Sequence, residues 1–216
     1  MPGEKAPEEH RRKDILRAAY DVAARQGVEA LTVRAVAARA AVSHGTVLFH
    51  FSRRDALVAA LLDSVLDATT VLRVPENVER LERPPDRMRL LLRTEMERLS
   101  GEPRHFRLFL EYWALGVRDA GIRRRVSVAL EQYRAAFGAI GQAAAHDDAT
   151  GSHHPNGPRY VATRMHEGVG AVAVSLIHGC ALQAVIDPKA FSVQQHFETA
   201  ARMLDGFRLS SKHTSS

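Results

Sequence analysis

The sequence has little of what defines secreted, fibrous or membrane-spanning proteins. Its single cysteine, Cys180, cannot form a disulfide within the chain. With only 14 glycines and 9 prolines in 216 residues, the chain is neither collagen-like nor of low complexity. Charges run through the first thirty residues, without the apolar core of a signal peptide, and the longest largely apolar run, residues 169–177, is too short to span a bilayer. We therefore expect a cytoplasmic protein with no membrane partner.

Sequence motifs of common enzymes are also missing. There is no His-Glu-x-x-His, Cys-x-x-Cys, Gly-x-Ser-x-Gly or phosphate-binding loop, so metal-dependent, nucleophilic and nucleotide chemistry has no local support. The chain has 11 histidines, but His166 and His178 would lie about 18 Å apart along one helix, too far to share a metal ion. His178 and Cys180 would point to different sides. These observations predict no enzyme activity, no metal and no cofactor.

Positive charge, in contrast, is concentrated near the N-terminus. Residues 10–54 carry nine lysines and arginines against three acidic residues, while the whole chain has a formal net charge of +5, so the remainder is close to neutral. A basic segment is most often a solvated face, but concentrated positive charge also attracts polyanions such as nucleic acid.

Apolar periodicity predicts an all-α chain that begins with three compact helices. The first helix ends at Gly27, a residue suited to a left-handed C-terminal position, and its apolar positions recur at helical spacing: Ile15, Ala18, Ala19, Val22 and Ala23. Thr32 and Ser43 are suited to cap two short helices separated by a tight turn. Residues 52–55 form a capping box before a longer helix over residues 56–72. Short helices with a tight turn inside a basic segment are typical of a helix-turn-helix unit.

Several stretches of this segment resemble one family of regulators. They are residues 12–19 (RKDILRAA), 27–37 (GVEALTVRAVA), 42–51 (VSHGTVLFHF) and 55–57 (DAL). Together they closely resemble the DNA-binding module of the tetracycline-repressor (TetR) family. The resemblance covers about residues 11–62, and it implies a homodimer whose third helices enter successive major grooves of a palindromic operator.

The resemblance also implies which residues contact double-stranded DNA. It makes Thr32, Phe49, His50 and Arg54 candidates for phosphate contacts. It places Ser43, His44, Thr46 and Leu48 nearest the base edges, and Gly45 would let the helix backbone approach the duplex closely. We expect Arg34, with Arg11, Arg12 and Arg53, to add affinity.

Two departures from the family pattern affect this interface. His44 stands where the family commonly has lysine, and Leu48 and Phe49 stand where tyrosines often follow. Leu48 can touch a thymine methyl group but cannot form a hydrogen bond, which predicts an A·T pair at that step.

The larger C-terminal part is expected to be helical and to bind a small-molecule inducer, as the family resemblance implies. An apolar cavity with a few polar groups would come from the aromatic cluster and its neighbours: Met96, Phe106, Phe109, Tyr112, Trp113, Tyr133, Phe137 and His166. His105 and His178 are further candidates for its polar groups. For each aromatic residue, a place in the core is the main alternative. Residues 146–159 have turn composition and are expected to form a surface loop.

The last two predicted helices, residues 159–186 and 192–209, carry a candidate dimer surface. Small residues form a flat ridge on the first of them and larger apolar residues follow on the second, and the set comprises Ala171, Ser175, Gly179, Phe197, Ala201 and Leu204. Such a pair of helices can join its symmetry mate in a four-helix bundle, which is also where the family dimerises. Packing of these residues within one chain is the alternative.

The sequence therefore predicts an all-α protein with an N-terminal three-helix helix-turn-helix DNA-binding domain and a larger helical ligand-binding and dimerisation domain. The expected boundaries are a disordered arm over residues 1–9, the DNA-binding domain over 10–55 and the second domain over 56–216, with 56–72 as the linking helix. The expected function is a ligand-responsive homodimeric repressor that binds a palindromic operator through residues 43–50. The alternative is a helical module that binds small molecules or proteins without specific DNA recognition.

Overall fold

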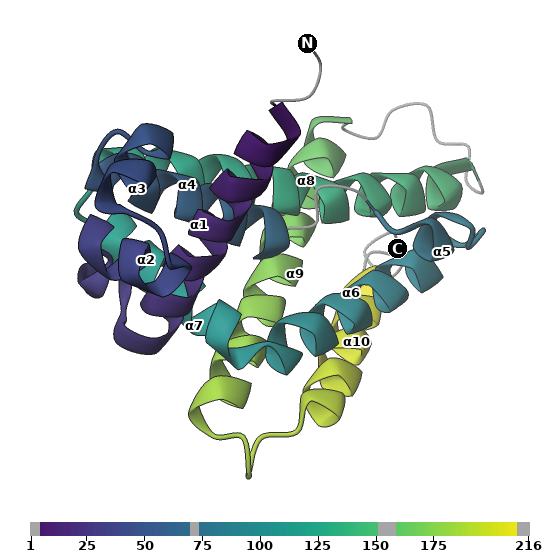
Figure 1. The fold of residues 1–216 in the computed structure, drawn as a ribbon. Helices are drawn as coiled ribbons and strands as arrows, with labels where there is room; N and C mark the ends of the chain where they lie inside the picture. The colour runs from purple at the N-terminus through teal and green to yellow at the C-terminus, as the bar shows by residue number, and fades with distance from the viewer. Residues whose placement is uncertain (1–4, 70–73, 151–158, 211–216) are drawn as a thin grey trace. The chain divides into compact units, whose positions relative to one another are not determined.

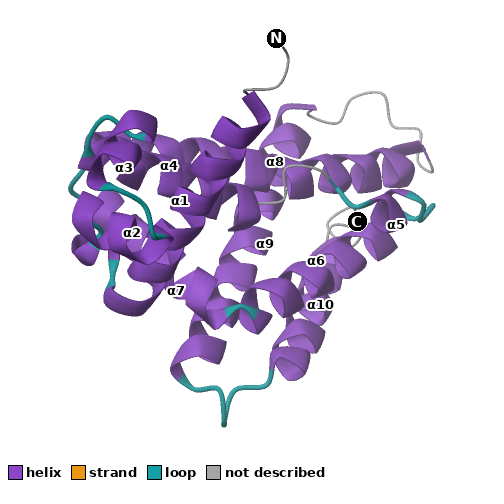
Figure 2. Ribbon diagram, in the orientation of Figure 1, coloured by secondary structure: helices purple, strands orange, loops and turns teal. Residues whose placement is uncertain are grey.

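Helices are the regular secondary structure of the residues that the computed structural model describes, which are 5–69, 74–150 and 159–210. Side chains are described for residues 8–69, 74–141 and 168–203. No strand occurs in these ranges (Figures 1 and 2), and the predicted all-α class is confirmed. The elements in chain order are α1 (Lys5–Gln26), the 3-10 turn η1 (Val28–Ala30), α2 (Val33–Ala40), α3 (His44–His50), α4 (Arg54–Thr69), α5 (Glu76–Glu79), α6 (Pro84–Gly101), α7 (Pro103–Gly116), α8 (Ala120–Thr150), α9 (Arg159–Ile186) and α10 (Val193–Ser210).

The helices form two compact units, one drawn from Met1–Thr69 and Arg107–Ala129, the other from Thr70–Phe106 and Leu130–Ser216. In the first unit, α1 packs against α2 and α4, and α2 packs against α3. The apolar positions that predicted the first helix are all buried, and Val36, Val47 and Phe51 join them in one core. A seven-residue helix such as α3 is too short to be stable alone, so this core holds it in place.

The end of α7 and the start of α8 belong to the first unit through three long-range contacts. The Tyr112 hydroxyl donates to the carbonyl of Val58 in α4 at 3.0 Å. The Glu111 carboxylate accepts a hydrogen bond from the backbone N–H of Val28 at 2.8 Å, and Arg125 forms an ion pair with Asp63. Residues 107–129 are therefore anchored to both η1 and α4.

In the second unit, α6 packs against α9 and α10, and α5 packs against α6. Its core contains Met96, Phe106, Tyr133, Phe137 and Ile177, each fully buried. At Gly170 the backbone of α9 lies so close to the carbonyl oxygen of Arg134 in α8 that a Cβ atom would clash with it. The two helix backbones are thus in direct contact.

Two expectations about irregular segments are wrong in part. The arm expected to be disordered over residues 1–9 is helical from Lys5 onward, because Pro7 falls in the first turn of α1, where a backbone N–H has no helical partner to lose. Residues 1–4 lie outside the described residues. The loop expected over residues 146–159 is helical up to Thr150, since no glycine or proline interrupts the chain before Gly151, and Arg159 already begins α9. Residues 151–158 lie outside the described residues.

Gly27 ends α1 with a positive φ, but it does not adopt the left-handed helical conformation that the sequence predicts. Its φ of 87° is combined with an extended ψ of 162°, a region that residues other than glycine rarely adopt. An added Cβ would also lie 3.4 Å from the Glu111 carboxylate.

The substitution Gly27→Ala should therefore lower the free energy of unfolding by about 1–3 kcal/mol, measured by urea denaturation. Gly101→Ala is the matched control, because Gly101 is helical and a Cβ there meets no atom within 4 Å. The control should be neutral or stabilising by less than about 1 kcal/mol. Equal stability of the two variants would contradict the strain assigned to Gly27.

Candidate nucleic-acid interface

The helix-turn-helix is built from two capped helices and one left-handed residue. The Thr32 hydroxyl accepts from the N–H of Ala35 at 3.1 Å and the Ser43 hydroxyl from that of Thr46 at 3.0 Å, so both predicted caps are confirmed. Between them, Ala41 has a φ of 54°, and the N–H of Val42 donates back to the carbonyl of Ala37. This conformation sharply reverses the chain between α2 and α3.

One face of α3 is buried and the other is free. Val47 is fully buried, whereas Ser43, His44, Gly45 and Phe49 are exposed. Thr46, Leu48 and His50 are half-buried. Every residue that the sequence predicted for the base edges is thus at least partly accessible, and their contact with DNA stays a prediction.

Gly45 is free of internal packing constraints. A Cβ at this position would meet only the Ser43 hydroxyl, at an ordinary contact distance of 3.7 Å. Its φ is not in the left-handed region, so neither backbone conformation nor packing requires a glycine here. The open space next to Gly45 is what close approach of an external partner would need.

Several arginines of the basic segment, two of them predicted DNA contacts (Arg12 and Arg54), have partners within the unit. The Arg54 guanidinium donates to the carbonyls of Leu31 at 2.8 Å and Val28 at 3.2 Å. Arg12 lies over the Phe51 ring at 4.8 Å, and Arg39 forms an ion pair with Asp21. Sequence reasoning missed these roles because each pair is far apart in the chain.

The remaining interface candidates lie at the surface. Thr32 and Arg34 are exposed, and so are Arg11 and Arg53. The Phe49 ring is 76% exposed and meets only the edge of the His50 ring among the aromatic side chains described, with their centroids 5.2 Å apart. The Phe49 ring is thus accessible to an external partner.

The aromatic residues predicted to bind a ligand are divided between the two units. Phe109, Tyr112 and Trp113 belong to the first. Met96, Phe106, Tyr133 and Phe137 belong to the second. Apart from the half-buried Trp113, all of these side chains are buried. The side chain of His166 lies outside the described residues.

A buried polar cluster lies in the core of the second unit. Glu95 is only 3% exposed, accepts a hydrogen bond from the Tyr133 hydroxyl at 2.8 Å and pairs with Arg98. Burial, together with the negative charge of Glu95, raises the pKa of Tyr133 well above its usual range. Sequence reasoning missed Glu95, although an acid on the apolar face of a helix is a signal that could have found it.

His178 lies beside this cluster. Its ring centroid is 5.7 Å from that of Tyr133 and 6.2 Å from that of Phe106. Burial lowers the pKa of His178 to about 4, so the ring is neutral at physiological pH. Among the described residues there is no group of three or more His, Cys, Asp or Glu side chains that could hold a metal ion.

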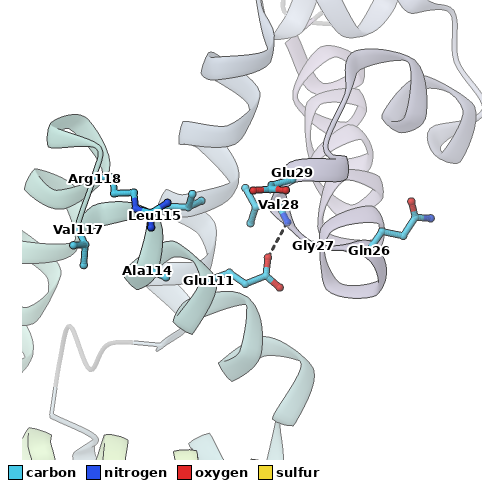
Figure 3. A pocket seen from close by; sticks show the side chains of 9 residues that line it. All are labelled: Gln26, Gly27, Val28, Glu29, Glu111, Ala114, Leu115, Val117 and Arg118. Atoms are coloured by element: carbon cyan, nitrogen blue, oxygen red, sulfur yellow. Dashed lines mark hydrogen bonds between the residues drawn. The ribbon is translucent and has the colours of Figure 1, made fainter.

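A pocket of about 570 Å³ lies within the first unit, between the end of α1 with η1 and the end of α7 (Figure 3). It is lined by Gln26, Gly27, Val28, Glu29, Glu111, Ala114, Leu115, Val117 and Arg118. None of these residues was predicted from the sequence to contact a ligand. No local pattern identifies the pocket, because its two walls are more than eighty residues apart in the chain.

The helix α9 exposes a long apolar stripe. Residues 168–186 have a mean hydropathy of 1.9, so by length and composition alone this helix could cross a membrane, a test that core helices also pass. Its buried side packs against α6 and α10 in the core of the second unit. The other side bears Gly168, Val172, Ser175, Gly179, Leu182 and Ile186, which are exposed or half-buried and recur every three or four residues.

The other residues predicted for a dimer surface differ in their burial. Ala171 is half-buried. Phe197 and Ala201 of α10 are already buried within the chain, and Arg93 lies over the Phe197 ring at 4.6 Å. The side chain of Leu204 lies outside the described residues. Among the described side chains, the predicted α9 residues thus remain at least partly accessible, whereas Phe197 and Ala201 of α10 are buried.

Comparisons with known proteins point to one family. Residues 15–61 match the family model described as "Bacterial regulatory proteins, tetR family". The HTH-type transcriptional repressor Rv3405c of Mycobacterium tuberculosis is 40% identical over 74 residues, which are 34% of this chain. The match spans about two fifths (39%) of that relative's length.

Solved structures share the fold over most of the chain. A transcriptional regulator from Pseudomonas aeruginosa has a TM-score of 0.74 and 20% identity, and the match covers 92% of this chain and 90% of that one. The regulator FadR from Bacillus subtilis, solved in complex with stearoyl-CoA, has a TM-score of 0.64 and 14% identity, and the match covers 89% of this chain and 96% of that one. At these identities the likeness concerns the fold.

The neutral state of buried His178 should make stability depend on pH. The unfolded chain binds a proton at this site below a pKa of about 6.5, and the folded chain only below about 4. The stability that His178 contributes is therefore complete above pH 6.5 and is lost as the pH falls toward 4, by about 3 kcal/mol in total. His178→Leu should remove this loss from urea denaturation curves compared at pH 7 and pH 4.5.

His10→Gln is the control for this measurement, because the His10 side chain is 80% exposed. It should show the same decrease in unfolding free energy as the unaltered chain. A His178→Leu variant that retains the full decrease between pH 7 and pH 4.5 would refute the assignment.

Proposed function

Residues 15–61 belong to the TetR family of bacterial regulatory proteins, and on this premise we propose that the protein is a ligand-responsive, homodimeric repressor of transcription. Its α3 would enter the major groove of a palindromic operator. The observation that carries this proposal is the two-sided α3, anchored by Val47 and Phe51 on one side and open around His44 and Gly45 on the other. Such regulators are DNA-binding proteins rather than enzymes, and we place this one in the cytoplasm.

The chemistry of the exposed face suits a duplex. Concentrated positive charge on the first unit attracts the phosphates, for which Thr32, Arg34, His50 and Arg54 are the proposed contacts. Since Arg54 also holds η1, its contribution to DNA binding would be partly indirect. At the base edges, Ser43, His44 and Thr46 can form hydrogen bonds, and Leu48 can contact a thymine methyl group.

The apolar stripe of α9 is the proposed dimer interface. Small residues at Ala171, Ser175 and Gly179 would let the α9 helix of a second copy approach closely, and Val172, Leu182 and Ile186 would lose their exposure to water. A two-fold axis through this face gives each dimer two copies of α3, as a palindrome requires.

A small molecule bound in the second unit would oppose DNA binding. The buried cluster of Glu95, Arg98 and Tyr133, with His178 beside it, supplies polar groups among aromatic side chains, the composition of ligand pockets. A ligand that prefers the state with weak DNA affinity must itself bind the DNA complex more weakly, by a coupling of about 1–3 kcal/mol.

The DNA interface is tested by selecting binding sites from random duplexes and measuring affinity for the selected site. The unaltered protein should prefer it over scrambled DNA by about a thousandfold and lose affinity steeply with added salt. Gly45→Leu should weaken binding to that site at least tenfold, because its side chain would fill the space between α3 and the bases. Gly101→Leu, at an equally open helical position, should bind like the unaltered protein. Equal affinity for selected and scrambled DNA would favour the module without specific recognition.

The dimer interface is tested by the mass in solution. The unaltered chain should sediment as two copies of the 23.8 kDa polypeptide. Val172→Glu should yield a monomer, because it places a charge within the α9 stripe at a position that is 47% exposed. Val128→Glu, at a 49% exposed position on α8, should remain dimeric. If both variants had the same mass, α9 would not be the interface.

A further inference from the structure

The pocket beside η1 is distinct from the buried cluster of the second unit. All of its lining residues belong to the first unit, which also carries α3. Its volume of about 570 Å³ falls in the range of small-molecule sites. Val28, Ala114, Leu115 and Val117 form the apolar part of its lining.

The charges of the pocket favour a cation. Two carboxylates, from Glu29 and Glu111, stand against one guanidinium, from Arg118. None of the three has an ion-pair partner among the residues for which side chains are described. An added positive group would therefore gain two opposite charges without displacing an existing pair.

One of the two carboxylates is already positioned. Oε2 of Glu111 accepts the hydrogen bond from Val28 N–H, drawn as a dashed line in Figure 3. This bond fixes the side chain at the edge of the apolar surface. The second oxygen, Oε1, has no hydrogen-bond donor among the described residues and can accept one from a ligand.

We propose that this pocket binds a small organic ammonium compound. The ammonium group lies between Glu29 and Glu111, and the apolar body lies on Val28 and Leu115. Arg118 disfavours a second positive charge and limits the site to monocations. The site is separate from the small-molecule site proposed above for the second unit.

A ligand in the pocket can affect the position of α3, because few contacts separate the two. The ammonium group binds the same Glu111 carboxylate that holds Val28 N–H, and the carbonyls of Val28 and Leu31 hold the guanidinium of Arg54. Arg54 begins α4, four residues after the end of α3. A shift of η1 therefore changes the support of α3. This consequence for DNA rests on the proposed function, whereas binding of the ammonium compound does not.

Calorimetry on the full chain without DNA tests the site, with phenethylamine as the probe and 2-phenylethanol as its neutral counterpart. The amine should bind at least threefold more tightly than the alcohol. The double variant Glu29→Gln/Glu111→Gln should lose this preference, since glutamine keeps an acceptor for Val28 N–H but carries no charge. Arg118→Gln should increase the affinity for the amine, because it removes a repelling charge. Glu9→Gln, an exposed change on α1 outside the pocket, should bind the amine like the unaltered chain.

Equal binding of amine and alcohol, or an unchanged preference in the double variant, would overturn the site. In a second measurement, saturating phenethylamine should alter the affinity for the selected duplex at least threefold in the unaltered chain and not in the double variant. Amine binding without this change would overturn the coupling to DNA. A chain that binds no duplex would overturn the proposed function, while calorimetry would still decide the site.

Discussion

Burial of one side of α3 is the constraint on which the rest of the structure depends. A helix of seven residues forms few backbone hydrogen bonds to offset the free-energy cost of helix nucleation, so it is unstable alone. It is stable here because Val47 and, directly after the helix, Phe51 are buried in the core of the first unit. The same packing decides which side chains remain outside. The exposed polar face, the open space at Gly45 and the exposed Phe49 ring all follow from the orientation that the core imposes on α3.

The arginines of the helix-turn-helix have two kinds of role. The basic segment suits a polyanionic partner, but Arg12, Arg39 and Arg54 also stabilise the module through an aromatic ring, a carboxylate and backbone carbonyls. Two of these side chains, Arg12 and Arg54, are also proposed DNA contacts, so the proposal assigns them both roles. Arg54 connects η1 to the start of α4, so the placement of α3 depends on a turn that also contacts α7 through Glu111.

Local features of this fold could be predicted from the sequence, and long-range pairs could not. The period of Ile15, Ala19 and Val22 predicts the first helix, and the hydroxyls of Thr32 and Ser43 mark two caps, because each depends on residues within one turn. Contacts such as Glu111 with Val28 or Glu95 with Tyr133 join residues 83 and 38 positions apart, and no local pattern encodes them. The pocket beside η1 was missed for that reason. The face of α3 was predicted from a family resemblance, whereas the burial of Phe197 depends on the packing of α10 with α6 and α9, which no local pattern encodes.

In the proposed dimer, two copies of α3 would enter successive major grooves on one side of a duplex. Protection of guanine N7 atoms from methylation reports major-groove occupancy directly, and it can be measured on the selected duplex with the purified full chain. We expect two symmetric clusters of protected guanines, with centres about one helical turn apart. A single cluster, or unchanged methylation of the major groove under saturating protein, would contradict the proposed dimeric binding mode.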